Sequence, residues 1–317
     1  MSGAKASLLP AGLPLQEILR NFINEETQMM TSPEVSASSD DAKWQSINWK
    51  AIKQHVLKLQ MRIAKAIREG KRGKVKALQW ILTHSKSAKF LTVKRVSQNK
   101  GSKTPGIDGI IWNTDSRRMI AANQLSRKAY KTKQLRRIYI PKKNGKLRPL
   151  GIPCMNDRAH QALYLLALEP ISETVADANS YGFRPNRSTA DAIQQCFICM
   201  SRKASANWVL EGNIKSCFDR IGHQWLIDNI QLDKRMLKQW LECGFIDKGL
   251  FYKTEEGTPQ GGIISPTLML LTLASLEQLV KSIAHKTGDK IHFIGYADDF
   301  VITGTSKEVL VNPKNIS

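Results

Sequence analysis

The chain has 317 residues, of which 42% are hydrophobic, and it carries 48 Lys or Arg against 27 Asp or Glu, a formal net charge of +21. A chain of this length can bury a sizeable core and form two lobes. Its charge favours nucleic acid or an anionic membrane surface as a partner. No apolar run approaches the roughly 20 residues that a membrane-spanning helix needs, and no secretory signal is recognisable.

Residues 1–43 are predicted to form a flexible leader, because the stretch TSPEVSASSDDAKW is small, polar and weakly patterned. The five cysteines, an odd number in a long chain, fit a reducing compartment. Cys196 and Cys199 have C-x-x-C spacing, but no second pair with zinc-ligand spacing follows. Because both lie in a segment with helical patterning, we interpret them as core residues.

The segment from Trp49 to Thr104 holds 16 Lys or Arg and a single acid, Glu69. Apolar residues recur at the spacing of amphipathic helices, which predicts helices over residues 52–67, 74–85 and 88–98. Such an excess of one sign is either the solvated face of a helical bundle or a surface that follows nucleic-acid phosphates, and the clustering favours the second. The candidate RNA contacts in this segment are Lys71, Arg72, Lys94 and Arg95.

Two strand-like runs, RRIYIP and KLRPLGIP, flank Asn144-Gly145, which is a strong signal for a β-hairpin. Basic residues cluster on this predicted ribbon, although charged side chains also serve simply to keep exposed strands soluble. The apolar run DRAHQALYLLALEPISE follows and predicts a long helix.

The last third of the chain predicts a sheet. WVLEGN opens as a buried strand, and EEGTPQGG is a turn that leads into a helix. GYADDF lies between apolar runs, which predicts a hairpin with Asp298 and Asp299 at its turn. Charge in an apolar setting is costly, so this pair requires a metal ion or solvent. The element order predicts an α+β fold with helices on one face of a palm-like sheet.

Five segments in this order, RRIYIPKKNGKLRPLGIP, SYGFRPNRS, EGNIKSCFDRI, EGTPQGGIISP and GYADDF, resemble the reverse transcriptases (maturases) encoded by group II introns, over roughly residues 44–306. The resemblance implies a basic helical N-terminal extension at 44–125, fingers at 126–200 and a palm at 201–317 of a right-hand polymerase. It implies RNA-directed DNA synthesis in intron splicing and mobility, with RNA, a DNA primer and deoxynucleoside triphosphates as partners. The implied location is the bacterial cytoplasm or an organelle of bacterial descent.

In this family two Mg²⁺ ions lie between a carboxylate on a palm strand and the YADD carboxylates, where they activate the primer hydroxyl and hold the leaving phosphates. Asp298 and Asp299 match the hairpin ligands. Asn213 stands at the position of the strand ligand, where family sequences read EGDIKSCFD. A neutral amide leaves one carboxylate fewer for two dications. Asp219 is six residues further on, about 20 Å along a straight strand, and is not expected to replace it.

Four further residues match nucleotide-binding positions of the family. Lys142 and Arg148, on the predicted hairpin, match contacts to the incoming triphosphate. Phe218 matches the residue that excludes a ribose 2′-hydroxyl, and Gln260, in TPQGG, matches a residue beside the nucleotide sugar. Ordinary packing would explain each one alone, but their shared order favours the set.

Arg184 and Arg187, in GFRPNRS, match a fingers motif that approaches the template or the nucleotide. After FVITGTSKEVL only a short stretch follows, so the chain is expected to be truncated, without the family's thumb. Three interpretations stay open at this point: a reverse transcriptase with impaired catalysis, an RNA-binding protein that does not polymerise, and a remnant reading frame of a mobile element.

Overall fold

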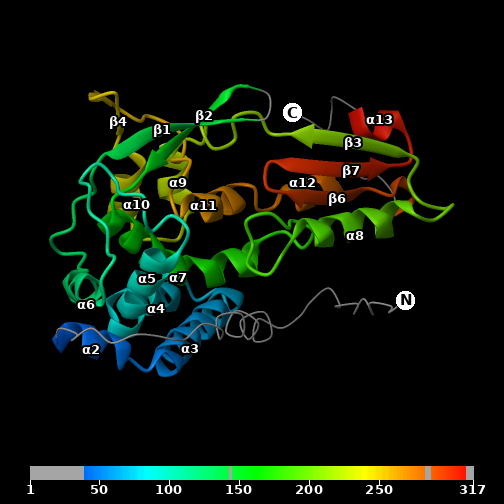
Figure 1. The fold of residues 1–317 in the computed structure, drawn as a ribbon. Coiled ribbons are helices and arrows are strands. Elements are labelled where there is room, and N and C mark those ends of the chain that lie inside the picture. Colours follow the sequence, from blue (N-terminus) through cyan, green and yellow to red (C-terminus); the bar gives the residue numbers. More distant parts are fainter. Residues whose placement is uncertain (1–38, 143–144, 283–286, 312–317) are drawn as a thin grey trace, which may run out of the picture.

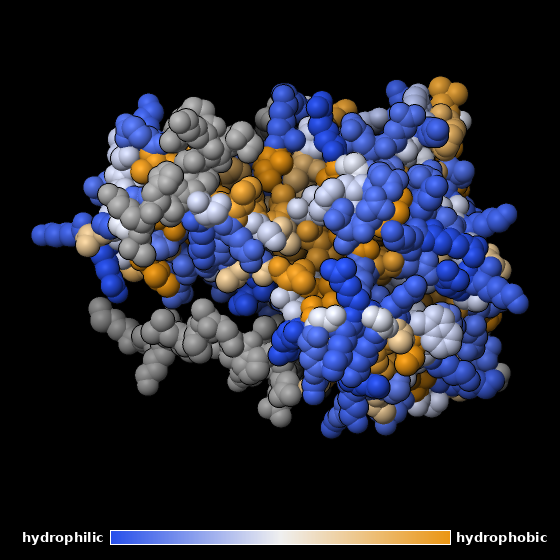
Figure 2. Space-filling model, turned by 180° about the vertical axis from the view of Figure 1, so that it is seen from behind, coloured by the Kyte–Doolittle hydropathy of each residue, from blue (hydrophilic) through white to orange (hydrophobic). Residues whose placement is uncertain are grey.

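The structure, a computed structural model, describes residues 39–142, 145–282 and 287–311. In Figure 1 a group of N-terminal helices lies below two separate sheets, and a long helix runs between these helices and the part of the molecule that carries the sheets. Seen from behind, hydrophobic residues gather near the middle of the molecule, between two ends where hydrophilic residues predominate (Figure 2). Among the described residues no helix is both long and apolar enough to cross a membrane.

The N-terminal part is helical, as predicted. Its helices are α2 (Ser39–Gln45), α3 (Trp49–Arg68), α4 (Arg72–His84), α5 (Lys86–Gln98) and α6 (Asp115–Gln124). Side-chain caps define three of the starts, because the side chains of Asn48, Ser85 and Thr114 each accept a hydrogen bond from the backbone amide three residues further on. Residues 39–43, which the sequence assigns to the leader, belong to α2, and the remainder of the leader lies outside the described residues.

Helix α7 (Met155–Val175) is the predicted apolar helix, and it is buried over most of its length. It packs against α3, α4 and α5 on one side and against α11 (Ser265–Thr272) on the other. One continuous core therefore joins the N-terminal helices to the part of the chain that carries the sheets.

The first sheet has the strand order β2-β1-β4-β5. Strands β1 (Leu135–Pro141) and β2 (Leu147–Ile152) form the predicted antiparallel hairpin, whose turn residue Asn144 lies outside the described residues. Strand β4 (Phe245–Asp247) pairs parallel to β1 and antiparallel to β5 (Leu250–Tyr252). About 100 residues separate β1 from β4 in the sequence. Because β4 and β5 lie beyond residue 200 but belong to the first sheet, the predicted boundary between fingers and palm at that residue does not divide the two sheets.

The second sheet is the predicted palm sheet, with the order β3-β7-β6. Its strands are β3 (Trp208–Asn213), β6 (His292–Tyr296) and β7 (Asp299–Gly304). Helix α8 (Thr189–Met200) packs on one face through Cys196 and Cys199. The prediction of core residues is confirmed for Cys199, which is buried, whereas Cys196 is half-buried at the edge of the same cluster. Helices α12 (Leu276–Ser282) and α13 (Lys307–Val311) pack on the other face. The prediction of helices on one face only is therefore wrong.

Strand β3 forms where the sequence predicts a strand, but it is not buried. Trp208 and Val209 are 47% and 49% exposed, because β3 is an edge strand and the covering helices lie over β6 and β7. An apolar run of strand length does not distinguish a central strand from an edge strand.

The helix predicted after TPQGG is interrupted. It is divided into α11 and α12 by a turn at Ser275, which has a φ of +79° and whose amide donates to Asp177. The remaining elements are α9 (His223–Asn229), α10 (Lys234–Leu241) and a 3₁₀ turn at Thr287–Asp289.

Candidate nucleotide and metal site

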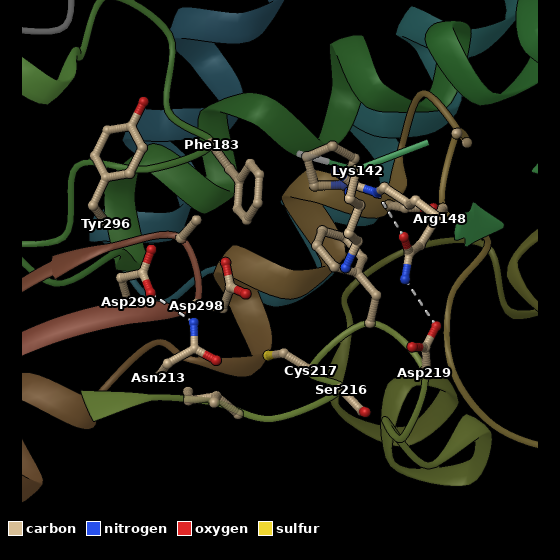
Figure 3. A pocket seen from close by; sticks show the side chains of 18 residues that line it. Lys142, Arg148, Phe183, Asn213, Ser216, Cys217, Asp219, Tyr296, Asp298 and Asp299 are labelled. Atoms are coloured by element: carbon tan, nitrogen blue, oxygen red, sulfur yellow. Dashed lines mark hydrogen bonds between the residues drawn. The ribbon is translucent and has the colours of Figure 1, made fainter. Parts of the chain in front are cut away.

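The YADD hairpin has a two-residue turn, Ala297 and Asp298, between the paired residues Tyr296 and Asp299. Ala297 has a φ of +60°, a left-handed conformation that turns of this length usually reserve for glycine at their first central position. For a residue with a Cβ the conformation costs about 1–2 kcal/mol. The turn directs Asp298 into a cavity (Figure 3), so the strained residue Ala297 directly precedes the carboxylate that faces the cavity.

The loop before α8 supports this turn from behind. The amide of Tyr181 donates to the carbonyl of Gly295, and the amide of Gly295 donates to the carbonyl of Asn179, both at 2.9 Å. Gly182 lies directly against the turn, and a Cβ there would overlap the backbone nitrogen of Ala297 and lie 2.7 Å from its Cα. The glycine of SYGF is therefore required by close backbone approach.

The same loop is anchored to α12. The side-chain amide of Asn179 donates to Glu277 at 2.7 Å, and Glu277 is 3% exposed and also binds Lys281. Burial opposes ionisation of Glu277, but the hydrogen bonds from Lys281 and Asn179 outweigh it and hold the pKa of that carboxyl below its usual value. The acid thus provides a fixed negative partner for the loop that positions the hairpin.

Asn213 ends β3 opposite Asp299, and its side-chain Nδ2 donates to Asp299 Oδ1 at 2.6 Å (Figure 3). The amide of Ile214 donates to the carbonyl of Asp298, so the strand end also holds the turn. The amide therefore supplies Asp299 with a donor that a carboxylate at position 213 could not supply at neutral pH.

These residues do not fit the family's two-ion site. Within the part of the chain that the structure describes, no group of three or more His, Cys, Asp or Glu side chains is arranged to hold a metal ion. Three carboxylates line the cavity, but Asp219 accepts a hydrogen bond from Gln260 and Asp299 is already hydrogen-bonded to a neutral amide. Hard dications bind best to several oxygen ligands that carry charge.

A cavity of about 740 Å³ lies between the β1–β2 hairpin and the YADD turn. Every residue predicted for the metal and nucleotide sites lines it: Lys142, Arg148, Asn213, Phe218, Gln260, Asp298 and Asp299. These residues come from parts of the chain more than 150 positions apart, and the fold brings all of them to one place.

A chain of hydrogen bonds crosses one side of this cavity. Arg148 Nε donates to Gln260 Oε1, and Gln260 Nε2 donates to Asp219 Oδ1, each at 3.0 Å. The backbone of Gln260 also accepts from the amide of Gly151 on β2 at 2.8 Å. Asp219 lies across the cavity from Asp298 and Asp299 (Figure 3) and orients Gln260, so it does not replace the missing carboxylate at position 213.

The cavity is also lined by residues to which the sequence pattern assigned no role. Phe183 and Phe218 form an edge-to-face pair with centroids 5.6 Å apart, so Phe218 is held in place by a second ring. Burial, and then the nearby charge of Asp298, raises the pKa of the Cys217 thiol to about 11, so this group is neutral at pH 7. Phe183 and Cys217 lie inside the motifs that carry the resemblance, and that position was the only signal for them.

Arg184 does not reach the cavity. It is 7% exposed and pairs with Glu173, which is 8% exposed, at 3.0 Å. It also donates to the carbonyls of Asp177 and Ser180. Its side chain is thus engaged by the loop that backs the YADD turn, and the expected contact with template is wrong for this residue because the guanidinium is enclosed by protein acceptors.

Replacing Arg184 by Met should reduce the free energy of unfolding by about 3–5 kcal/mol, because Glu173 would be left as a buried charge without a partner. Chemical denaturation monitored by circular dichroism measures this loss. Arg187→Met, on the same loop, is the matched control and should change the stability by about 0.5 kcal/mol or less. Equal stability of Arg184→Met and the unchanged chain would contradict a structural role for the pair.

The basic N-terminal residues differ in how they are engaged. Lys71 pairs with Glu69 at 2.8 Å, Lys94 lies over the Trp49 ring and Arg95 pairs with Glu169 at 3.3 Å. Arg72 is exposed at the start of α4. Three of the four candidate RNA contacts therefore also bind protein groups, so part of their charge is already compensated and each should bind a phosphate less strongly.

Two family models match the chain. One, described as the N-terminal domain of reverse transcriptase, matches residues 44–125, and the other, described as reverse transcriptase (RNA-dependent DNA polymerase), matches residues 140–316. The chain belongs to the reverse transcriptase family. The predicted fingers–palm fold is confirmed at this level.

Among the relatives of this reverse transcriptase are Protein YkfC of Escherichia coli, 39% identical over 193 residues, and the group II intron-encoded protein LtrA of Lactococcus lactis, 35% identical over 210 residues. A putative COX1/OXI3 intron 1 protein of Saccharomyces cerevisiae is 30% identical over 199 residues. The matches cover 57%, 62% and 59% of this chain, but 51%, 34% and 23% of the relatives. The chain thus spans about half or less of the length of these proteins.

A solved structure of telomerase from Candida albicans also aligns with the chain. The TM-score is 0.41 and the identity 13%, over 59% of this chain and 40% of that one.

Proposed function

We propose that the chain is the fingers and palm of an RNA-directed DNA polymerase of the group II intron type, with polymerisation weakened by Asn213. The observation that carries the proposal is the convergence of all seven predicted metal- and nucleotide-site residues on one cavity. The family membership supplies the reaction class, which is RNA-templated DNA synthesis in intron splicing and mobility.

In this proposal the cavity binds a deoxynucleoside triphosphate. Lys142 and Arg148 lie at its fingers side and bind the phosphates, since an ammonium and a guanidinium are the usual partners of such groups. Phe218, held by Phe183, limits space beside the sugar, and Gln260 is oriented toward it by Asp219. Template RNA and a DNA primer enter next to this cavity, with Arg187 as a contact of the template.

The site is poorly suited to binding two metal ions. We propose that Asp298 and Asp299 hold at most one Mg²⁺ ion, and only weakly, because the third acidic position is an amide bonded to Asp299. For the same reason a second candidate function is RNA binding without polymerisation. The net charge of +21 favours this alternative as strongly as it favours the first. We propose the bacterial cytoplasm or an organelle of bacterial descent as its location.

Primer extension on an RNA template in the presence of Mg²⁺ separates the two functions. The chain is expected to extend primers slowly, and Asp298→Asn is expected to remove the remaining activity while leaving RNA affinity unchanged. RNA binding with no extension above the level of Asp298→Asn would support the binding function instead. Absence of any RNA binding at physiological salt would contradict both.

A further inference from the structure

Trp80 is an unusual residue on the surface of the N-terminal helices. It lies on α4 and is 62% exposed, although aromatic side chains of this size are normally largely buried. His84, one turn further along, stacks on it with ring centroids 4.3 Å apart and an interplanar angle of 21°. The ring of His84 is itself fixed, because its Nδ1 lies 2.8 Å from the carbonyl of Trp80. The indole is thus oriented by a neighbour and still presents much of its surface to solvent.

The segment that carries this pair contains no acidic residue. No Asp or Glu occurs from residue 70 to residue 107. Lys76, Trp80 and His84 follow one another at i, i+4 and i+8 and therefore share a face of α4, and all three are exposed. The acid before this stretch, Glu69, is paired with Lys65 and Lys71. From residue 72 to residue 90, the exposed basic side chains are Arg72, Lys74, Lys76 and Lys86.

We propose that the Trp80–His84 pair is a stacking platform for an unpaired base of RNA, with Lys76 and Arg72 binding the adjacent phosphates. Every base has a flat face that stacks on an aromatic ring, and cations beside the ring match the charge of the strand. His84 covers part of one side of the indole, so the platform accepts one base. The inference rests on the RNA binding in the proposed function and deepens it by assigning a site and a preference for single strands.

The charge of this face decides against a protein partner. An apolar docking surface would need a contiguous group of exposed hydrophobic side chains. On α4, Ile81, at 42%, is the large hydrophobic side chain that is exposed besides Trp80. The exposed residues one and two turns before Trp80 on this face, Lys76 and Arg72, are both basic. Figure 1 shows α4 among the N-terminal helices, apart from the two sheets that border the nucleotide cavity, so this contact is separate from the reaction site.

The test measures the affinity of the full chain for a short single-stranded RNA by fluorescence anisotropy. Trp80→Ala is expected to weaken binding by about 5- to 100-fold, the range typical for loss of one stacked base. Trp80→Phe keeps a ring and should stay within about 3-fold of the unchanged chain. Trp225→Ala is the matched control, because Trp225 is also exposed, at 42%, but lies on α9, and it should bind as the unchanged chain does.

Salt dependence separates stacking from charge. Arg72→Ala and Lys76→Ala should each reduce the slope of log affinity against log salt concentration by about 1, whereas Trp80→Ala should leave that slope unchanged. For a duplex RNA of the same length, whose bases are already stacked, Trp80→Ala should change the affinity by less than about 2-fold. Melting curves confirm that each variant is folded.

Three outcomes would overturn the inference. Equal affinity of Trp80→Ala and the unchanged chain, with clear RNA binding by both, removes the platform and leaves the proposed function intact. A changed oligomeric state of Trp80→Ala at unchanged RNA affinity would identify a protein contact instead. Equal losses for Trp80→Ala and Trp225→Ala would show a global effect. Failure of the unchanged chain to bind RNA would instead count against the proposed function.

Discussion

Asn213→Asp is expected to make the stability of the chain depend on Mg²⁺. Without a divalent ion the variant loses the 2.6 Å donor to Asp299 and places two carboxylates side by side. A hydrogen bond to a charged group contributes about 1.5–3 kcal/mol, so the free energy of unfolding should fall by about that amount. Three carboxylates can share a dication, and added Mg²⁺ should restore the loss. Thermal melting at a series of Mg²⁺ concentrations measures both effects.

Asn213→Ser is the control for this prediction. It removes the amide donor without adding charge, so it should lose a similar amount of stability and show no response to Mg²⁺. In primer extension, Asn213→Asp should exceed the unchanged chain by about 100-fold, the scale of restoring one electrostatic contact to a transition state. Melting of Asn213→Asp that is independent of Mg²⁺ would show that the geometry of the strand end cannot form the metal site.

Gly182→Ala is expected to disrupt the YADD turn. The added methyl would overlap the backbone of Ala297, and because the three nearest atoms are all backbone atoms of Tyr296 and Ala297, a side-chain movement could not relieve the overlap. Forcing extra volume into such a contact costs about 1–3 kcal/mol. Because the turn positions Asp298, the affinity for a fluorescent deoxynucleoside triphosphate should fall by at least about 10-fold. Denaturation and nucleotide titration of the same preparation give the two values.

Gly73→Ala provides the matched glycine control. Gly73 lies within α4, and a Cβ there would meet no atom within 4 Å. Alanine is favoured over glycine by about 0.5–1 kcal/mol in a helix interior, and by less at the second residue of α4, so this variant should be equally or slightly more stable and should bind nucleotide normally. Normal nucleotide binding by Gly182→Ala would contradict the role assigned to the loop before α8.

Patterns of local origin could be predicted from the sequence. The helices around Leu59, Leu78 and Leu168 follow from apolar spacing, and the β1–β2 and YADD hairpins follow from short turns between strand-like runs. Contacts between distant segments could not be predicted in this way. The parallel pairing of Leu135 with Phe245 carries no local signal, and neither does the exposure of β3, because both depend on which elements become neighbours.

The two arginines of GFRPNRS illustrate the same limit. Both are basic residues in a motif associated with nucleic acid, and the sequence gives no reason to separate them. Only the fold places Arg184 beside Glu173 and encloses the pair, which makes that residue structural. A buried charge is fixed by the partner that the tertiary structure supplies.

The sequence by itself determined the family, the basic character of residues 49–104 and seven of the residues that line the cavity. It also determined that position 213 carries an amide. The tertiary structure alone decided what that amide does, because its bond to Asp299 joins strands 86 residues apart. It likewise decided that Trp80 lies outside the core, since a helical pattern fixes which residues share a face but not which face is covered.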